Sequence, residues 1–204
     1  MPKVVDPDEN RRMIAEAACR AIARKGVQSA TMMDIAHEAG VTTGMIANYF
    51  RNKDAIVAAA LRVPFENVEA RISARMKSGS NDLAEILDAA IPTTDEYMLD
   101  TAVWVSFWGH IATNRKFRTL NAKLHEEGFA LFGDAVRRAW PESGDWPSDV
   151  FDQTLRSIVT FLFGLSTGGV TNPAAWTITI QRAQLRAHLT ITRQWANAEA
   201  DRPS

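Results

Sequence analysis

The stretch TMMDIAHEAGVTTGMIANYF, residues 31–50, decides how the N-terminal part of this chain folds. Thr31, followed three residues later by Asp34, is a capping-box variant that opens a short helix, and Gly40 ends it. Thr42 is then placed to cap a second short helix. Apolar side chains at helical spacing predict that the two helices lock together across the turn at Gly40. The stretch therefore predicts a helix-turn-helix of about twenty residues.

The second helix of this pattern begins with small, uncharged residues. Its first turn contains no carboxylate, so the positive end of its dipole stays available to phosphate. Thr42 and Thr43 offer short hydroxyl donors, and Gly44 lets a backbone approach closely. We expect Thr43, Met45 and Asn48 to reach base edges, since Asn pairs with adenine and a thioether can touch the thymine methyl. For Met45, packing in the protein core explains the residue equally well.

Two residues that flank the second helix complete a nucleic-acid-binding pattern. Tyr49 and Lys53 are placed where a phenol and an ammonium could hold neighbouring phosphates. A lysine considered alone is more often just solvated, and a capped hairpin can be purely structural. The agreement of cap, turn glycine, small residues and aromatic pair favours double-stranded DNA as the partner.

Composition and charge are ordinary for a soluble globular protein. The 204 residues have a formal net charge of −1, 46% are apolar and 23% are charged. Residues 1–62 carry nine Lys/Arg and seven Asp/Glu, a small excess that permits a nucleic-acid module without demanding one. The single cysteine, Cys19, forms no internal disulfide, and the sequence shows no secretory leader or membrane-length apolar run. We expect a cytoplasmic protein.

Helical periodicity continues to the C-terminus and predicts an all-α fold of about nine helices. Asn52 should cap a long fourth helix that Pro64 kinks, and the bend could be the element that switches between two conformations. WTITI (176–180) alternates like a strand, but its continuation without turn residues favours a helix. We divide the chain into a DNA-binding domain, residues 1–52, and a ligand-binding and dimerisation domain, residues 53–204. The later helices are expected near 83–91, 95–112, 115–139, 149–169 and 174–197.

The residues 26–61, GVQSATMMDIAHEAGVTTGMIANYFRNKDAIVAAAL, resemble the N-terminal DNA-binding domain of TetR-family transcriptional regulators. Residues 104–132 are similar to the betaine/choline-responsive branch of that family. The resemblance implies a homodimeric repressor that a small-molecule effector releases from DNA. Ala47 and Asn48 depart from the commonest residues of the family at these positions, so no operator sequence is carried over. The resemblance assigns phosphate contacts to Thr31, Thr42, Tyr49 and Lys53, and base or near-base contacts to Thr43, Gly44 and Asn48.

An aromatic-rich helix within residues 97–117 is the candidate effector region. Core packing explains most of its apolar residues, but two indoles beside a few polar groups would also suit a ligand cavity. Tryptophan is the best ring for holding a quaternary ammonium, so a choline-like ligand is conceivable. The candidate ligand-binding residues are Tyr97, Trp104, Phe107, Trp108, His110, Ile111 and Asn114.

The last two helices carry apolar residues on more than one face, which predicts a four-helix interface between two copies of the chain. Two recognition helices about 34–36 Å apart would read a near-palindromic operator. The alternatives are a DNA-binding structural protein without a ligand and a helical enzyme that binds small molecules. No catalytic constellation, metal site or cofactor motif is found. The candidate interface residues are Leu155, Ile158, Leu162, Phe163, Leu185 and Leu189.

Overall fold

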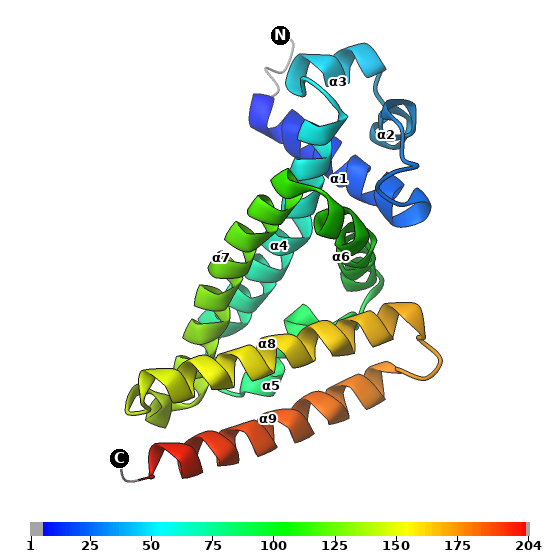
Figure 1. Cartoon of the computed structure of the whole chain (residues 1–204). Helices are drawn as coiled ribbons and strands as arrows, with labels where there is room; N and C mark the ends of the chain where they lie inside the picture. The colour runs from blue at the N-terminus through cyan, green and yellow to red at the C-terminus, as the bar shows by residue number, and fades with distance from the viewer. Residues whose placement is uncertain (1–5, 203–204) are drawn as a thin grey trace. The chain divides into compact units, whose positions relative to one another are not determined.

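The computed structural model describes residues 6–202, and every regular element in that range is helical (Figure 1). The predicted all-α class of about nine helices is confirmed. No helix within this range is both long and apolar enough to span a membrane. In chain order the elements are α1 (Pro7–Lys25), α2 (Met32–Ala39), α3 (Thr43–Tyr49), α4 (Lys53–Lys77), α5 (Leu83–Leu87), η1 (Asp88–Ala90), α6 (Asp95–Thr113), α7 (Arg115–Ala139), η2 (Pro141–Gly144), α8 (Ser148–Thr171) and α9 (Ile178–Ala200), where η marks a 3-10 helix.

The first four helices begin where local side-chain caps place them. The Asp6 carboxylate accepts the N–H of Asp8 at the start of α1, and the Asn52 side chain accepts the N–H of Ala55 at the start of α4, both at 3.0 Å. Gly26 ends α1 with a positive φ of 79°. These caps satisfy backbone groups that a helix terminus leaves unpaired, and they involve residues close in sequence.

α4 continues through Pro64, and the kink that the sequence predicts there stays a prediction. A proline inside a helix has no N–H, so the carbonyl of Ala60, four residues earlier, loses its helical donor. The thiol of Cys19 on α1 donates to this carbonyl at 3.2 Å. Burial, together with the nearby Asp100 and Glu16 carboxylates, raises the pKa of the thiol to about 12. Cys19 therefore keeps its proton and satisfies the group that Pro64 leaves free.

Two predicted helix boundaries need correction. The short helix expected over 83–91 is divided into α5 and η1. The last helix begins at Ile178 rather than near 174, because the N–H groups of Ala175 and Trp176 bond to the carbonyl of Asn172 and form a turn. Thr177 caps α9 by accepting the N–H of Ile180 at 3.4 Å. The alternation in residues 176–180 marks this turn and cap rather than a strand.

Packing divides the chain into two compact units. Unit 1 comprises Met1–Asn67 and Leu99–Leu124, and unit 2 comprises Val68–Met98 and His125–Ser204. α4, α6 and α7 each contribute to both units. The boundary predicted after residue 52 divides the chain by function, into a DNA-binding part and the rest. This functional division stays a prediction.

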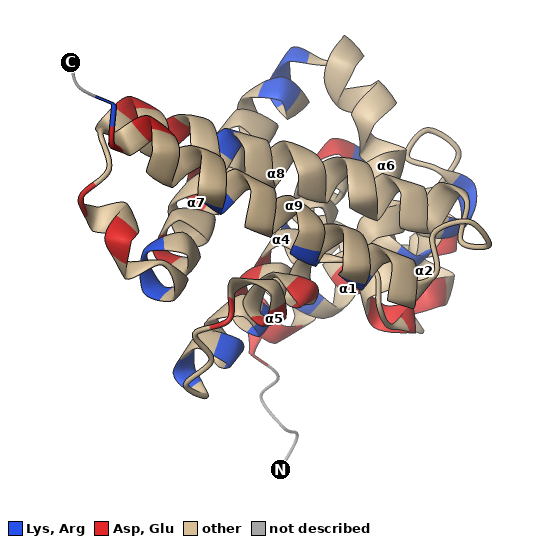
Figure 2. Cartoon of the chain, turned by 90° about the horizontal axis from the view of Figure 1, so that it is seen from below, with Lys and Arg blue, Asp and Glu red and all other residues tan. Residues whose placement is uncertain are grey.

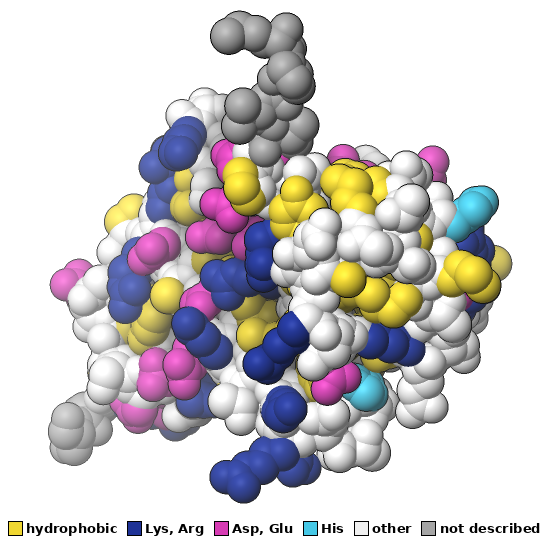
Figure 3. Space-filling model, turned by 90° about the horizontal axis from the view of Figure 1, so that it is seen from above, with side chains coloured by type: hydrophobic (Ala, Val, Ile, Leu, Met, Phe, Trp, Pro, Cys, Tyr) yellow, Lys and Arg dark blue, Asp and Glu magenta, His cyan; other side chains and the backbone are white. Residues whose placement is uncertain are grey.

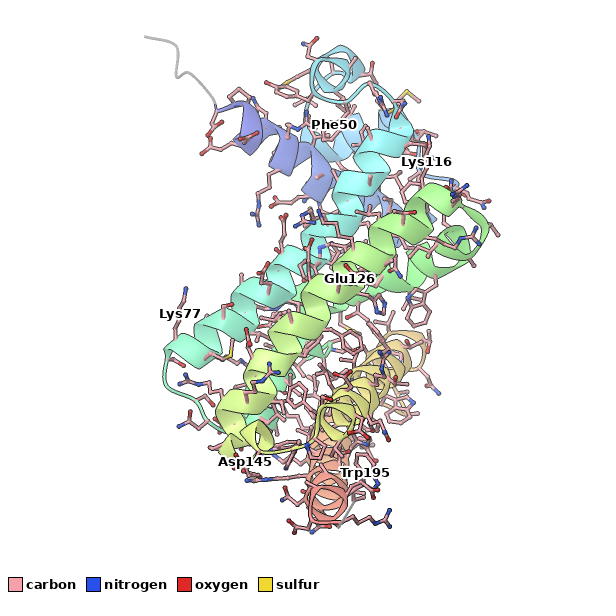
Figure 4. All side chains as sticks on the ribbon, turned by 60° about the vertical axis from the view of Figure 1, so that its left-hand side comes forward. Phe50, Lys77, Lys116, Glu126, Asp145 and Trp195 are labelled. Atoms are coloured by element: carbon pink, nitrogen blue, oxygen red, sulfur yellow. The ribbon has the colours of Figure 1, made fainter. Side chains whose placement is uncertain are left out.

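The core of unit 1 fixes the geometry of the N-terminal helices. Ile14 and Ile22 on α1, Ile35 on α2 and Ile46 on α3 are fully buried in one apolar cluster. Phe50, which follows α3, joins the same cluster where the chain turns into α4 (Figure 4). α3 thus presents one apolar face to the core and leaves its other faces to solvent.

The core of unit 2 lies around the antiparallel pair α8 and α9, which run side by side (Figure 1). Arg182 of α9 forms a two-pronged ion pair with Asp88 of η1, with distances of 2.7 and 3.1 Å. Arg75 of α4 reaches the same carboxylate at 3.1 Å. Burial would raise the pKa of Asp88, but the hydrogen bonds from the two arginines outweigh it and lower that pKa. Three elements are therefore joined at one carboxylate.

Candidate nucleic-acid interface and effector region

The cap at the start of α2 and the turn between α2 and α3 are both built as the sequence indicates. The Thr31 hydroxyl accepts the N–H of Asp34 at 3.1 Å, and the Asp34 carboxylate accepts the N–H of Thr31 at 3.0 Å. Gly40 adopts the left-handed conformation, φ 65° and ψ 29°, which lets the chain reverse direction between the helices. The two short helices are thereby held at a defined angle.

The start of α3 combines open space with free donors. The Thr42 hydroxyl oxygen accepts the N–H of Met45 at 3.1 Å, so its proton is left to donate outward. A Cβ at Gly44 would meet only the Thr42 hydroxyl oxygen, at an ordinary 3.7 Å. Nothing inside the protein therefore requires glycine here. The first turn holds no acidic residue, as predicted.

The exposed surface of α3 is uncharged and able to form hydrogen bonds. Thr43 and Asn48 are exposed, and within residues 6–202 neither side chain has a hydrogen-bond partner. Met45 is half-buried beside the fully buried Ile46, so core packing and base contact both remain open for it. Figure 3 looks onto the end of unit 1 that carries α3 and shows Lys and Arg side chains beside mostly uncharged surface.

Thr31 and Lys53 both have internal roles, and the sequence indicated only the Thr31 cap. The Thr31 hydroxyl also donates its proton to Asp34, at 2.8 Å, so that proton is already committed. The Lys53 ammonium donates to the carbonyl of Gln28 at 2.9 Å, which fixes the loop before α2. An ammonium has three donors, so Lys53 keeps two for phosphate. Of the two, Lys53 is the better candidate for a phosphate contact.

Most positive charge on α1 is neutralised by acids within the same unit. Arg20 and Arg24 share Glu38, and the hydrogen bond from Arg24 is the main reason for the lowered pKa of Glu38. Lys25 pairs with Asp34 at 2.6 Å and is the main cause of the lowered pKa of that carboxyl. The described cations of residues 6–53 that have no carboxylate partner are Arg11, Arg51 and Lys53.

Sequence reasoning missed Asn10, Arg11 and Arg51. Asn10 and Arg11 lie on the first turns of α1, and both donate to Tyr49 at the end of α3, each at 2.7 Å. Arg51 is exposed directly after the aromatic pair. The place of Arg51 in the motif could have revealed it, but the other two are brought to α3 only by tertiary packing.

The candidate effector residues on α6 do not all line open space. Phe107 is fully buried, 0% exposed, and packs against Phe117 with ring centroids 6.2 Å apart. This burial corrects its assignment, because a side chain without accessible surface cannot touch a ligand. Trp104 and Ile111 are half-buried against the same core cluster, whereas Trp108 is 41% exposed. Trp108 and the outer part of Trp104 remain the stronger candidates.

The polar residues proposed for effector binding already contact other groups of the protein. The His110 ring packs on Phe117 at 4.7 Å between centroids. Asn114 caps α7 by accepting the N–H of Lys116 at 3.0 Å, and it lines a hollow of about 660 Å³. Tyr97 belongs to unit 2, whereas the other six candidates belong to unit 1. The Arg71 guanidinium covers the Tyr97 ring at 3.8 Å, so this ring face is already occupied by a cation.

The residues predicted for a dimer interface lie mostly inside one protomer. Leu155, Ile158, Leu162, Leu185 and Leu189 are all buried in the core of unit 2. They pack between α8, α9 and the rest of the unit, so they have almost no surface left for a partner. Of the predicted set only Phe163 is exposed.

α9 has three distinct faces. Leu185, Leu189 and Ala196 point into the core, and a second face pairs its arginines with acids of the same unit. The third face is uncharged and exposed, and the ribbons of α8 and α9 are mostly tan along their middle in Figure 2. At helical spacing this face carries Ile180, Ala187, Ile191, Trp195 and Ala198.

No group of three or more metal-ligating side chains is found in the described part of the chain. Three of the four histidines pack on phenylalanines: besides His110 on Phe117, the His125 and Phe163 ring centroids lie 5.3 Å apart, and His188 stacks on Phe161 at 4.0 Å between centroids. Burial lowers the pKa of the His125 and His188 imidazoles. These contacts are those of packed side chains.

Comparison with known families agrees with this geometry. Residues 14–60 match the model of bacterial regulatory proteins of the tetR family. Residues 80–193 match that of the C-terminal part of BetI-type transcriptional repressors, which is more than half of the chain. The chain belongs to the TetR family of transcriptional regulators. The helix-turn-helix of α2 and α3 lies within the matched residues 14–60, and its role as the DNA-binding element stays a prediction.

Relatives with curated names are also transcriptional regulators. The chain is 34% identical over 110 residues to the regulator PksA of Bacillus subtilis, a match that spans 52% of this chain and 54% of PksA. It is 27% identical over 147 residues to the regulator BetI of Burkholderia ambifaria, which spans 68% of this chain and 76% of BetI. Neither name is that of an enzyme.

Solved structures show the same fold along nearly the whole chain. A putative transcriptional regulator from Pseudomonas aeruginosa PAO1 superposes with a TM-score of 0.77 at 22% identity, covering 97% of this chain and 96% of that one. A putative regulator from Saccharomonospora viridis in complex with choline superposes with a TM-score of 0.74 at 24% identity, covering 90% of this chain and 96% of that one. These likenesses establish the fold.

Proposed function

We propose that this TetR-family protein is a homodimeric repressor that binds a near-palindromic operator and is released by a small cationic effector. The surface of α3 carries the proposal. It combines a capped, acid-free N-terminus, a glycine that internal packing does not need, and exposed Thr43 and Asn48 without internal partners. Such a surface suits close approach to base edges in a major groove. The protein would act in the cytoplasm, where bacterial DNA is found.

A homodimer follows from the operator and from the exposed faces of α8 and α9. A helix-turn-helix monomer reads half a site, so a twofold operator needs two copies. The uncharged face of α9 with Ile180, Ile191 and Trp195 is the surface we assign to the partner, and Phe163 on α8 is a further exposed apolar residue. An exposed apolar stripe of this kind is typical of a subunit interface.

The effector class rests on two observations. The C-terminal region matches the BetI-type model, and a structure of the same fold was solved with choline. α6 supplies Trp104 and Trp108, and indoles hold quaternary ammonium groups well. We therefore place the effector among small quaternary ammonium compounds, beside α6.

The first experiment is selection of operators from a randomised duplex library at physiological salt. An enriched palindrome establishes the specific regulator, whereas sequence-independent binding with a steep salt slope supports a DNA-binding structural protein instead. The variant Thr43→Ala/Asn48→Ala is the control, because it alters two exposed side chains and should lose the enrichment while staying folded.

The effector is then tested by release from the selected operator. Choline is compared with its neutral isostere 3,3-dimethylbutan-1-ol, in which carbon replaces the quaternary nitrogen. Release by choline alone supports recognition of the charge, and Trp108→Ala should weaken it. Release by both or by neither contradicts the proposed effector class while leaving the DNA-binding function intact.

A further inference from the structure

The C-terminal end of α3 is held by the first turns of α1. The Asn10 side-chain amide donates to the Tyr49 hydroxyl oxygen at 2.7 Å, and Asn10 is only 9% exposed. A phenol that accepts at its oxygen is left to donate its own proton elsewhere. Tyr49 is half-buried and packs against the core of unit 1, so part of its side chain remains accessible to solvent. The contact therefore restricts the directions in which the Tyr49 proton can point.

Arg11 supplies the positive charge and the hydrogen-bond donor that the C-terminal end of α3 lacks. α3 has only seven residues, no basic residue in its last turn and no glycine cap. The last carbonyls of such a helix are unpaired, and positive charge is favourable beside them. Arg11 donates to the Tyr49 carbonyl at 2.7 Å and lies 4.8 Å from the centroid of the Phe50 ring. It therefore caps α3 from another helix.

A short helix depends on such outside contacts for its orientation. Within α3 only Ile46 is buried, and the Thr42 cap holds only the N-terminal end. A seven-residue helix is not stable alone, so tertiary contacts decide its angle. That angle sets which base pairs the exposed side chains reach.

We propose that Asn10 and Arg11 are positioning residues of the DNA interface: Asn10 directs the Tyr49 hydroxyl proton to a DNA phosphate, and Arg11 fixes the C-terminal end of α3. This inference rests on the proposed operator binding. Asn10 acts through the Tyr49 hydroxyl, and Arg11 acts through the Tyr49 carbonyl and the Phe50 ring. Both influence recognition without reading a base.

A double-mutant cycle tests Asn10, using the full-length protein and the selected operator. Asn10→Ala and Tyr49→Phe should each weaken binding about 3- to 10-fold, the range of one hydrogen bond. Once Tyr49→Phe has removed the hydroxyl, Asn10→Ala should have no further effect, because its target is gone. Independent, multiplying losses overturn the role of Asn10, as does unchanged binding by either single variant. Circular dichroism selects a temperature at which all variants are folded.

Arg11 is tested by salt dependence and base preference. Arg11→Gln should relax the base preference read by the end of α3 while the slope of log affinity against log salt stays unchanged. A slope reduced by about 0.9 with preference intact would instead make Arg11 a phosphate contact and overturn the positioning role. The neighbouring Arg12→Gln is the matched control, because Arg12 pairs with Glu16 on its own helix. Failure of the wild-type protein to enrich any operator would count against the proposed function itself.

Discussion

Gly44 is a residue that internal packing does not require, and we propose that DNA requires it. A Cβ there would have ordinary contact with one atom, so alanine fits the free protein. Alanine also favours a helix by about 1 kcal/mol over glycine. Gly44→Ala should therefore keep or raise the melting temperature.

The same substitution should weaken operator binding at least about tenfold, or 1.4 kcal/mol, because the added methyl group would stand where we propose that DNA approaches. Thermal melting and fluorescence anisotropy with labelled operator measure the two effects. Gly144→Ala is the control, since an added Cβ there meets nothing within 4 Å and Gly144 lies far along the chain in η2. Undiminished binding by Gly44→Ala would remove Gly44 from the interface.

Asn48 and Lys53 should contribute in different ways. Asn48→Ala removes an unpartnered amide, so it should change preference at one operator position by about 1–3 kcal/mol. Lys53→Ala should weaken all DNA roughly uniformly and reduce the salt slope by about one. It also frees the Gln28 carbonyl that Lys53 now holds. Equal losses on operator and random DNA for both variants would contradict these roles, as measured by competition binding.

At the scale of elements, Pro64 and Cys19 form a pair joining α4 to α1. Cys19→Ala leaves the Ala60 carbonyl buried without a donor, which should cost about 1–3 kcal/mol of unfolding free energy. Pro64→Ala restores the helical N–H to that carbonyl. In the Pro64→Ala variant, Cys19→Ala should therefore lower the free energy of unfolding by clearly less than it does in the wild-type protein. Urea unfolding of the four proteins measures the coupling, and strictly additive losses would show that the thiol contact is incidental.

The two apolar faces of α9 should respond differently to substitution. Ile191 is 66% exposed, so Ile191→Glu should split the dimer in sedimentation experiments while leaving helix content unchanged. Leu185 is buried in its own protomer, so Leu185→Ala should cost about 2–5 kcal/mol of stability without directly removing interface contacts. A dimer that survives Ile191→Glu would place the interface elsewhere.

At the scale of the whole molecule, stability should fall as pH falls from 7.5 toward 5.5. Burial lowers the pKa of His125 and His188 in the folded protein, so the unfolded chain binds more protons below about pH 6.5. The pKa values of Asp82, Asp88 and Glu142 are also lowered, so these carboxylates stay ionised in this window. Urea unfolding against pH measures the effect. His125→Gln/His188→Gln should flatten the curve, and an unchanged curve would contradict this cause.

The sequence by itself determined the parts of the structure that depend on neighbours along the chain. Thr31 with Asp34, Gly40 and Thr42 each form contacts within five residues, so their types alone placed α2, the turn and α3. The acid-free first turn and the small residues behind the DNA-binding prediction are equally local. These features also carried the resemblance that the family comparison confirmed.

Tertiary structure alone decided which side of each later helix is covered. Leu162 and Phe163 are adjacent and both apolar, yet one is buried and the other exposed, because only one faces the core of unit 2. The five predicted interface residues other than Phe163 lie inside the protomer for the same reason. Asn10 and Arg11 meet Tyr49 across almost forty positions. Such contacts depend on how helices pack, and side-chain spacing within one helix contains no information about its partner.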